Sequence, residues 1–423
     1  MLMTLAEKVL AKNAGLEYVR PEQIVEAVID TVMLHDIGTP GIIPPLAQLG
    51  YDKISENIKC VIIPDHFVPA PTVQAAENLR ITKQFAEKMG CIYYGVGRGG
   101  VSHQVMLENG HVLPGQIVVA PDSHATSYGA LGALGTGFGV TDVAIALGTG
   151  RLWFTVPPTI KLILNGRLRD NVGAMDVIIH LLQVFGETKL IYKSLEITGE
   201  IIGSMSVSER ICIANLAYEL GVKFCLIIPD KATSNYLASI GAPKTQFILP
   251  DDGAQYEEII EMDLSDLEPM VAFPHHPTCG RPAIEAVGTK IDQAFIGSCA
   301  NGRIEDLRIA ACVLKGKKVH SMVRMIVSPA SQAIYQTALD EGLIDTFIKA
   351  GACVTNPGCG ACLGGHMGLI ADEEICISTS NRNYRGRMGS TKGEVYLASP
   401  TTVATSAVTG VITLPNAYRR ELR

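Results

Sequence analysis

Residues 114–124 have the sequence PGQIVVAPDSH, a short β-branched apolar run that ends in a cluster of polar side chains. Residues 59–67, KCVIIPDHF, repeat this form. Runs of this length that are rich in Val and Ile and are closed by Pro and Asp predict buried strands that end in turns. We expect further strands at residues 161–168, 223–230 and 292–299.

Segments with helical periodicity lie between the expected strands. Residues 72–90, 208–221 and 331–351 place apolar side chains at helical spacing and end at glycine. This alternation predicts an α/β protein with buried, mostly parallel sheets. A chain of 423 residues is too long for one ordinary core and predicts two or three domains. The best candidate boundaries are Pro157–Pro158 and the end of the acidic stretch 251–268.

Composition and charge exclude several classes of protein. The net charge of −7 argues against nucleic acid or an anionic membrane as a partner. No stretch is long and apolar enough to cross a bilayer, since even the uncharged residues 123–141 are interrupted by glycines. The eleven cysteines, in a chain that opens without a secretory signal, predict reduced thiols and a cytoplasmic location.

Polar clusters follow three of the expected strands. They are Asp65-His66, Asp122-Ser123-His124 and the segment 298–301, SCAN. Because ligands collect at the carboxyl ends of strands in α/β sheets, we expect these clusters to meet in one cleft. The alternative is that Asp and Ser only cap the helices that follow. Histidine in two clusters and cysteine in the third favour a functional site.

Two glycine-rich loops could bind a phosphate or another anion. Residues 95–100, GVGRGG, fit the dinucleotide pattern, but we expect no helix after them and therefore no dinucleotide site. Residues 129–139, GALGALGTGFG, precede a helical segment and could present backbone N–H groups to an anion. Tight packing of this loop on a sheet is the alternative. The chain has no P-loop motif.

The cysteines suggest an inorganic centre. Cys359 and Cys362 form a C-x-x-C pair inside the glycine-rich segment 356–365, NPGCGACLGG, and Cys299 follows an expected strand. A structural zinc site would need a fourth ligand. Three thiolates could instead hold three corners of a [4Fe–4S] cluster and leave one iron open for Lewis-acid chemistry. Buried thiols or a redox pair are the alternatives.

Five motifs together resemble a known family. They are HQVMLENGHVLPG (103–115), DSHATSYGALGALGTGFG (122–139), IGSCANGRIEDLRIAA (296–311), GCGACLGG (358–365) and STSNRNYRGRMGS (378–390). In this order and spacing they are similar to those of aconitase-superfamily hydro-lyases, and most similar to the branch of large subunits of the 3-isopropylmalate dehydratase and homoaconitase type. The resemblance extends from about residue 5 to the C-terminus.

The resemblance implies a fold and a set of site residues. It implies three α/β/α domains, at residues 1–156, 157–286 and 287–423, around a cluster-binding cleft. It also implies metal ligands (Cys299, Cys359, Cys362), catalytic residues (Asp65, His66, His103, Asp122, His124, Glu196) and substrate-binding residues (His35, Ser123, Asn381, Arg382, Arg387).

The resemblance further implies the reaction and the partners. One [4Fe–4S] cluster per subunit, with one iron not ligated by cysteine, would serve reversible dehydration of a 2-hydroxy diacid, with isopropylmalate of leucine biosynthesis as the first expectation. Homoaconitate and dimethylmalate- or citramalate-type substrates stay open. A small swivel-domain subunit is expected to complete a heterodimer or heterotetramer, because the family's serine base lies in a segment that this sequence does not contain. The alternative of another class is a non-catalytic iron–sulfur sensor or electron carrier.

The sequence departs from the family pattern at three places. Ala300 and Ala125 stand where threonine is usual, which affects hydrogen bonding around the site rather than the ligands. Residues 273–282, FPHHPTCGRP, do not match the pattern. His275, His276 and Cys279 there have metal-like spacing, but we expect a domain linker.

Overall fold

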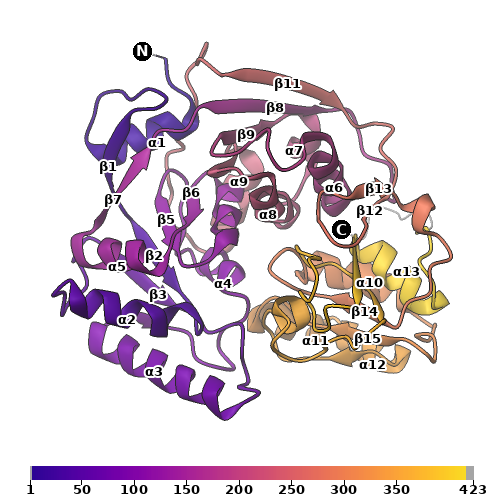
Figure 1. Cartoon of the computed structure of the whole chain (residues 1–423). Coiled ribbons are helices and arrows are strands. Elements are labelled where there is room, and N and C mark those ends of the chain that lie inside the picture. Colours follow the sequence, from indigo (N-terminus) through magenta and orange to yellow (C-terminus); the bar gives the residue numbers. More distant parts are fainter. Residues whose placement is uncertain (1, 416–423) are drawn as a thin grey trace.

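The computed structural model describes residues 2–415, so residues 416–423 of the expected third domain lie outside the described part. The chain forms three sheets of five, four and seven strands and a separate two-stranded ribbon (Figure 1). Helices cover the sheets, and the α/β class predicted from the sequence is confirmed. No helix in residues 2–415 is long and apolar enough to cross a membrane.

The first sheet is parallel throughout, with the strand order β4-β3-β2-β5-β6. Its strands are β2 (Thr31–Leu34), β3 (Lys59–Ile62), β4 (Ile92–Tyr93), β5 (Ile117–Ala120) and β6 (Leu134–Gly137). The helices of this part are α1 (Leu5–Ala14), α2 (Gly38–Gln48), α3 (Val73–Met89), α4 (Ser102–Glu108), the 3-10 helix η1 (Ser123–Leu131) and α5 (Val140–Thr149). The antiparallel ribbon pairs β1 (Ile24–Val28) with β7 (Arg151–Thr155). All four residues of β5 are buried, as is typical of a central parallel strand.

The second sheet is also parallel and has the order β10-β9-β8-β11. Its strands are β8 (Thr159–Asn165), β9 (Ser194–Thr198), β10 (Phe224–Ile227) and β11 (Glu258–Asp263). Its helices are α6 (Ala174–Phe185), α7 (Glu200–Ser204), α8 (Val207–Leu216), η2 (Ala217–Leu220) and α9 (Lys231–Ser239). One hydrophobic cluster joins these elements to the inner face of the first sheet.

The third sheet has the order β13-β12-β18-β17-β14-β15-β16. Its strands are β12 (Met270–Ala272), β13 (Gly280–Pro282), β14 (Gln293–Ile296), β15 (Arg324–Val327), β16 (Cys353–Val354), β17 (Ile375–Ser378) and β18 (Glu394–Ala398). Its helices are η3 (Ala283–Ala286), α10 (Ile304–Leu314), α11 (Gln332–Asp340), α12 (Leu343–Ala350), η4 (Gly360–Leu363) and α13 (Pro400–Thr409).

Residues 273–282 were expected to be a linker, and this expectation was wrong. They form the turn and second strand of the antiparallel hairpin β12–β13, which joins the edge of the third sheet. Residues 270–286 therefore belong with the third sheet, although the sequence analysis placed them in the second domain. The Nδ1 atom of His276 lies 2.7 Å from the Thr278 hydroxyl and 3.2 Å from Glu187, and Cys279 is exposed.

Local sequence signals explain where the expected helices begin and end. Thr72 caps α3 by accepting a hydrogen bond from the Ala75 N–H, and Gly90 ends the helix in the left-handed conformation. The segment 331–351 divides into α11 and α12 because Gly342, with φ of 73°, interrupts the helical run.

The glycine loops are explained by close packing. A Cβ atom at Gly129 would lie 1.5 Å from the Cys225 carbonyl oxygen, so the loop 129–139 packs directly on β10. The expectation that no helix follows residues 95–100 was wrong, because α4 begins at Ser102. Gly100 nevertheless lies against the main chain of Ser331, where an added Cβ would approach the Cα to 2.4 Å. Gly100 therefore allows the part of the chain that forms the first sheet to pack against the part that forms the third sheet.

Candidate active site

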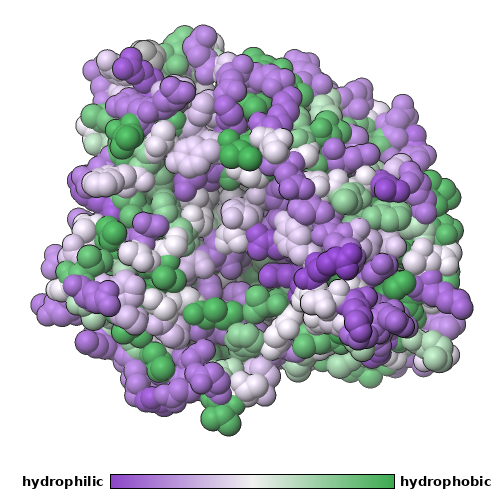
Figure 2. Space-filling view, in the orientation of Figure 1, coloured by the Kyte–Doolittle hydropathy of each residue, from purple (hydrophilic) through white to green (hydrophobic). Residues whose placement is uncertain are grey.

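The polar ends of strands from the first and third sheets line one cleft. Figure 2 shows that the face drawn in Figure 1 is hollowed near its centre. The residues that line the cleft are Asp65, His66, His103, Asp122, His124, Cys299, Cys359, Cys362, Leu363, Asn381 and Arg387. The polar clusters after β3, β5 and β14 therefore do meet, as expected for the carboxyl ends of strands in an α/β protein.

Three buried thiols gather at one end of this cleft. The Asn381 amide joins two of them, since its Nδ2 lies 3.0 Å from Cys299 Sγ and its Oδ1 lies 3.3 Å from Cys362 Sγ. Cys359 Sγ lies 3.5 Å from a carboxylate oxygen of Asp65. Burial and the nearby Cys362 raise the pKa of Cys299 to about 12. Three soft donors held together in this way suit a metal centre, which would displace their protons on binding.

Glycines let the C-x-x-C segment fold tightly against its surroundings. A Cβ atom at Gly364, whose φ is 79°, would lie 2.6 Å from the Arg387 carbonyl oxygen. At Gly365 the added atom would lie 2.6 Å from the ring of Phe67. Ser298, just before Cys299, adopts a left-handed φ of 80°, which is costly for a non-glycine residue and typical of functional sites. The backbone around the thiols is therefore built for close approach.

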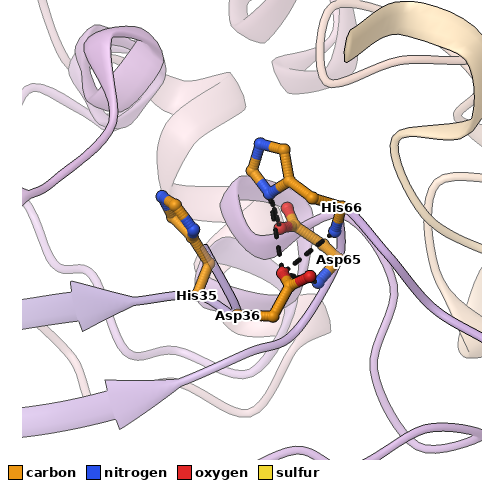
Figure 3. A group of neighbouring side chains, drawn as sticks. All are labelled: His35, Asp36, Asp65 and His66. Atoms are coloured by element: carbon orange, nitrogen blue, oxygen red, sulfur yellow. Dashed lines mark hydrogen bonds and ion pairs between the residues drawn. The ribbon is translucent and has the colours of Figure 1, made fainter. Parts of the chain in front are cut away.

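An Asp–His pair follows β3, and a further aspartate at the end of β2 supports it (Figure 3). Asp65 forms an ion pair of 2.6 Å with His66 Nδ1. The carboxylate of Asp36 accepts hydrogen bonds from the backbone N–H groups of Asp65, His66 and Phe67 at 3.0, 3.1 and 2.8 Å. Asp36 is thus a positioning residue for the turn that carries the pair. Asp36 was not predicted as a site residue from the sequence, although it lies next to His35.

The charges around His66 favour its protonated form. Burial alone would lower the pKa of His66, but the charges of Asp65 and Asp36 raise it well above its ordinary range. The imidazole of His35 lies beside that of His66, with ring centroids 4.5 Å apart. Ligand atoms of these four residues lie within 4.8 Å of one another, which would also suit a divalent cation. Because Asp36 already accepts three N–H groups, however, its oxygens are poorly available to a metal ion.

A second histidine group surrounds Asp122 at the end of β5. His103 Nε2 lies 3.1 Å from Asp122 Oδ1, and the backbone N–H of His124 donates to the same oxygen at 2.7 Å. The Tyr128 hydroxyl lies 3.1 Å from the other ring nitrogen of His103. Burial would raise the pKa of Asp122, but His103 and His124 hold it well below its usual range. Asp122 therefore stays ionised and holds the imidazole of His103 and the backbone N–H of His124.

Glu219, which the sequence analysis missed, connects the second sheet's helices to the cleft. Its carboxylate lies 3.1 Å from His124 Nε2 and 2.6 Å from Arg382 Nε, and it accepts a hydrogen bond of 2.8 Å from the Tyr384 hydroxyl. Burial opposes ionisation, but His124 and these other partners lower the pKa of Glu219 to about 2. A second guanidinium nitrogen of Arg382 donates to Ser123 Oγ at 3.3 Å.

Arg387 presents a cation to the cleft. Its Nη2 lies 4.0 Å from Cys362 Sγ, and no group in the described residues accepts a hydrogen bond from its buried Nε. A buried guanidinium N–H without a partner is well placed to meet an anionic oxygen of a ligand.

Glu196 does not lie at the cleft where the sequence analysis expected it. It sits on β9 and accepts hydrogen bonds from the N–H of Ala6 at 3.0 Å and from the Tyr256 hydroxyl at 3.1 Å. Burial raises its pKa from the ordinary 4.5 to about 7. Glu196 therefore anchors the N-terminus of α1, whereas the carboxylate that reaches the cleft residue His124 from this part of the chain is that of Glu219.

Glu196→Gln is expected to change how stability depends on pH. In the unfolded chain Glu196 ionises near 4.5, whereas the folded chain keeps its proton up to about 7. Between these values the folded state binds more protons, so the free energy of unfolding falls as pH rises, by up to about 3 kcal/mol, and levels off above that window. Urea unfolding of both proteins from pH 5 to pH 8 measures the difference. If the free energy of unfolding of the two proteins depended on pH in the same way, Glu196 would not cause the expected decrease.

Asp36→Asn is expected to lower kcat about 10- to 100-fold, because the amide can accept only part of the three N–H bonds and the Asp65–His66 turn moves. Losing the charge should also lower the pKa of His66, so the alkaline limb of the pH–rate profile moves to lower pH. Asp372→Asn at the surface, where Asp372 pairs with Lys392, is the control. An unchanged profile in Asp36→Asn would show that Asp36 does not position His66.

Comparisons with known proteins extend over nearly the whole chain. A family model described as the aconitase family (aconitate hydratase) matches residues 7–287 and 279–410. A Methanothermobacter thermautotrophicus protein named "Probable 3-isopropylmalate dehydratase large subunit" is 46% identical over 419 residues, which cover 99% of this chain and 100% of the relative. "3-isopropylmalate dehydratase large subunit" of Halothermothrix orenii is 46% identical, covering 98% and 99%. The protein of the same name from Acetivibrio thermocellus is 43% identical, covering 98% and 100%.

Proposed function

The chain belongs to the aconitase family, and on that premise we propose that it is the cluster-bearing large subunit of a 3-isopropylmalate dehydratase. As a hydro-lyase it would isomerise its substrate by removing water and adding it back, without net redox chemistry. The observation that carries the proposal is the meeting of three thiols, two Asp–His groups and an unpaired arginine in one cleft. The cytoplasmic location that we propose rests on the eleven free cysteines.

The family implies a [4Fe–4S] cluster, and the donor set of this chain fits one. Cys299, Cys359 and Cys362 would hold it, and no fourth cysteine lines the cleft within the described residues. Asn381 and Ser298 lie within hydrogen-bonding distance of these thiols and would tune them. When bound through three thiolates, the cluster would offer one iron to the substrate hydroxyl as a Lewis acid.

His66 is proposed as the acid that protonates the departing hydroxyl. Its proton on Nδ1 is held by Asp65, so the proton on Nε2 is the one that can be given to a ligand. His66 Nε2 lies 4.0 Å from Oδ2 of Asp122, which also lines the cleft. The raised pKa of His66 keeps this acid charged near neutral pH. His103, whose ring is held by Asp122, and His124, whose ring is held by Glu219, would complete the proton-handling groups.

The arginines are proposed to bind the substrate carboxylates. Arg387 offers its unpaired Nε to the cleft, and Ser123 together with the Glu219-anchored Arg382 forms a second polar group. Asn381, expected to contact substrate, instead has its amide engaged by the thiols, so we propose that it orients the cluster ligands. His35, buried beside His66, would support that imidazole.

Arg382→Lys is expected to lower kcat/KM by about 10- to 100-fold, an effect on the order of 1–3 kcal/mol of transition-state binding. Lysine keeps the charge but cannot reach Glu219 and Ser123 together with the flat fork that arginine provides. Steady-state kinetics of the assembled enzyme measure the effect. Arg385→Lys, at an exposed position of the same loop, is the matched control. If Arg382→Lys and Arg385→Lys had the same kcat/KM, Arg382 would not belong to the substrate site.

A small subunit is implied by the name "large subunit" that the relatives carry. We propose that it is a swivel-type subunit that covers the cleft and excludes water, in a heterodimer or heterotetramer. Much of the pocket for the substrate's side chain would then come from that subunit, so the large subunit alone constrains substrate choice weakly.

An anaerobic assay of the reconstituted pair tests the proposed substrate. Isopropylmalate, homoaconitate and citramalate or dimethylmalate should be compared by the ultraviolet absorbance of the alkene product or substrate. We expect the highest kcat/KM for isopropylmalate. A higher value for one of the other compounds would assign the chain to that substrate. No turnover of any of these acids by a cluster-loaded pair would favour an iron–sulfur sensor or electron carrier.

A further inference from the structure

Two cysteines away from the cleft lie at neighbouring positions of the first sheet, Cys60 on β3 and Cys91 directly before β4. β3 and β4 pair in parallel with Val61 opposite Ile92, so Cys60 and Cys91 are the preceding pair in register. The side chains of the two cysteines interact, since each shifts the pKa of the other. Both pack in the hydrophobic cluster that α2 and α3 close over this side of the first sheet (Figure 1). Neither residue lines the cleft.

The geometry of the two strands suits a disulfide. Neighbouring strands lie about 4.8 Å apart, and disulfides join residues whose Cα atoms are about 4.4–6.8 Å apart. Residues in register on parallel strands point to the same face of the sheet, so the sulfurs can meet without rearrangement of the backbone. We propose that Cys60 and Cys91 form a dithiol site that reacts with a hydroperoxide and closes to a disulfide.

The two thiols differ in a way that assigns their roles. Cys91 is partly exposed and can meet a small oxidant, whereas Cys60 is buried. The contact with Cys60 lowers the pKa of Cys91, and the same contact together with burial raises the pKa of Cys60. Because Cys91 is the thiol that a small oxidant can reach, we assign the first reaction to Cys91 and the step that resolves the product to Cys60.

The reaction balances with one hydroperoxide. The Cys91 thiolate attacks the peroxide, so that an S–O bond forms and the O–O bond breaks. With hydrogen peroxide, the released hydroxide takes up a proton and leaves as water. Cys60 then attacks the Cys91 sulfur, the S–S bond forms, the S–O bond breaks, and the proton of Cys60 leaves with the second water. Two thiols are oxidised to a disulfide by two electrons, and the peroxide is reduced to two waters.

Peptide mapping of the cluster-loaded chain tests the site. Trypsin cleavage after Lys59, Arg80, Lys88 and Arg98 releases peptides 60–80 and 89–98, which hold one cysteine each. After a low dose of hydrogen peroxide and alkylation of the remaining thiols, we expect these two peptides to be joined and to separate on reduction. Cys91→Ser should abolish the joined species. The exposed Cys312 and Cys353 should remain alkylated at the same dose.

Two results would overturn the proposal, and neither needs a variant. One is that Cys91 stays alkylated at doses that oxidise Cys312 and Cys353. The other is that Cys91 accumulates as sulfinic or sulfonic acid while Cys60 remains a thiol. A second variant, Cys60→Ala, supports the assigned roles if Cys91 sulfenic acid becomes trappable by a dione reagent. If Cys60 in Cys91→Ser is oxidised at a lower dose than Cys91 in Cys60→Ala, the assigned roles fail.

Discussion

Cys299→Ser, Cys359→Ser and Cys362→Ser are each expected to abolish the broad absorbance of the iron–sulfur cluster together with turnover. Serine oxygen is a poor ligand for iron compared with thiolate, and the site offers three thiolates for the whole cluster. Removing one thiolate would leave the cluster held by only two cysteines. In Cys299→Ser and Cys362→Ser, the Asn381 amide would at the same time lose a thiol contact.

Iron content, visible absorbance and thermal unfolding of the reconstituted variants measure this prediction. Cys60→Ser is the matched control, since Cys60 is also buried, within β3, but lies outside the cleft. It should keep full iron content and activity. The variants at the cleft should lose iron while the chain remains folded. A Cys362→Ser protein with full iron content would contradict the three-thiolate assignment.

The parts of the cleft that carry a local signature could be predicted from the sequence. Asp65-His66 and Asp122-Ser123-His124 each follow an apolar run, and parallel strands bring such ends to one edge. The C-x-x-C pair and Cys299 were found in the same way. The fold class followed from alternating strand and helix patterns, because burial on both faces leaves continuous apolar runs in the strands.

The residues that were missed depend on contacts between distant parts of the chain. Glu219 is separated from His124 and Arg382 by 95 and 163 positions, and nothing in its helical segment marks these partners. Glu196 was placed at the cleft by the family resemblance alone, whereas its hydrogen bond from Ala6 spans 190 positions. Which of Glu196, on β9, and Glu219, on η2, reaches the cleft is decided by how these elements pack.

The chain is expected to show almost no turnover without a small subunit. Dehydration next to a carboxylate requires a base that removes a C–H proton, and the carboxylates around the cleft are weak bases. Asp65, Asp122 and Glu219 are each held by a histidine or an arginine, and their pKa values are lowered in spite of burial. The imidazole of His66 is held protonated. We therefore expect the proposed small subunit to supply the base, and its absence to cost about 10²- to 10⁴-fold in kcat.

The most direct test is the turnover of isopropylmalate by the anaerobically iron-loaded chain with and without the candidate small subunit. Both samples should have the same cluster absorbance, so that loss of the cluster cannot explain a difference. Activity should rise with added small subunit until the two chains are equimolar, from a background at least about a hundredfold lower. Turnover by the lone chain at the rate of the pair, or no turnover of isopropylmalate by a cluster-loaded pair, would contradict the proposed two-subunit dehydratase.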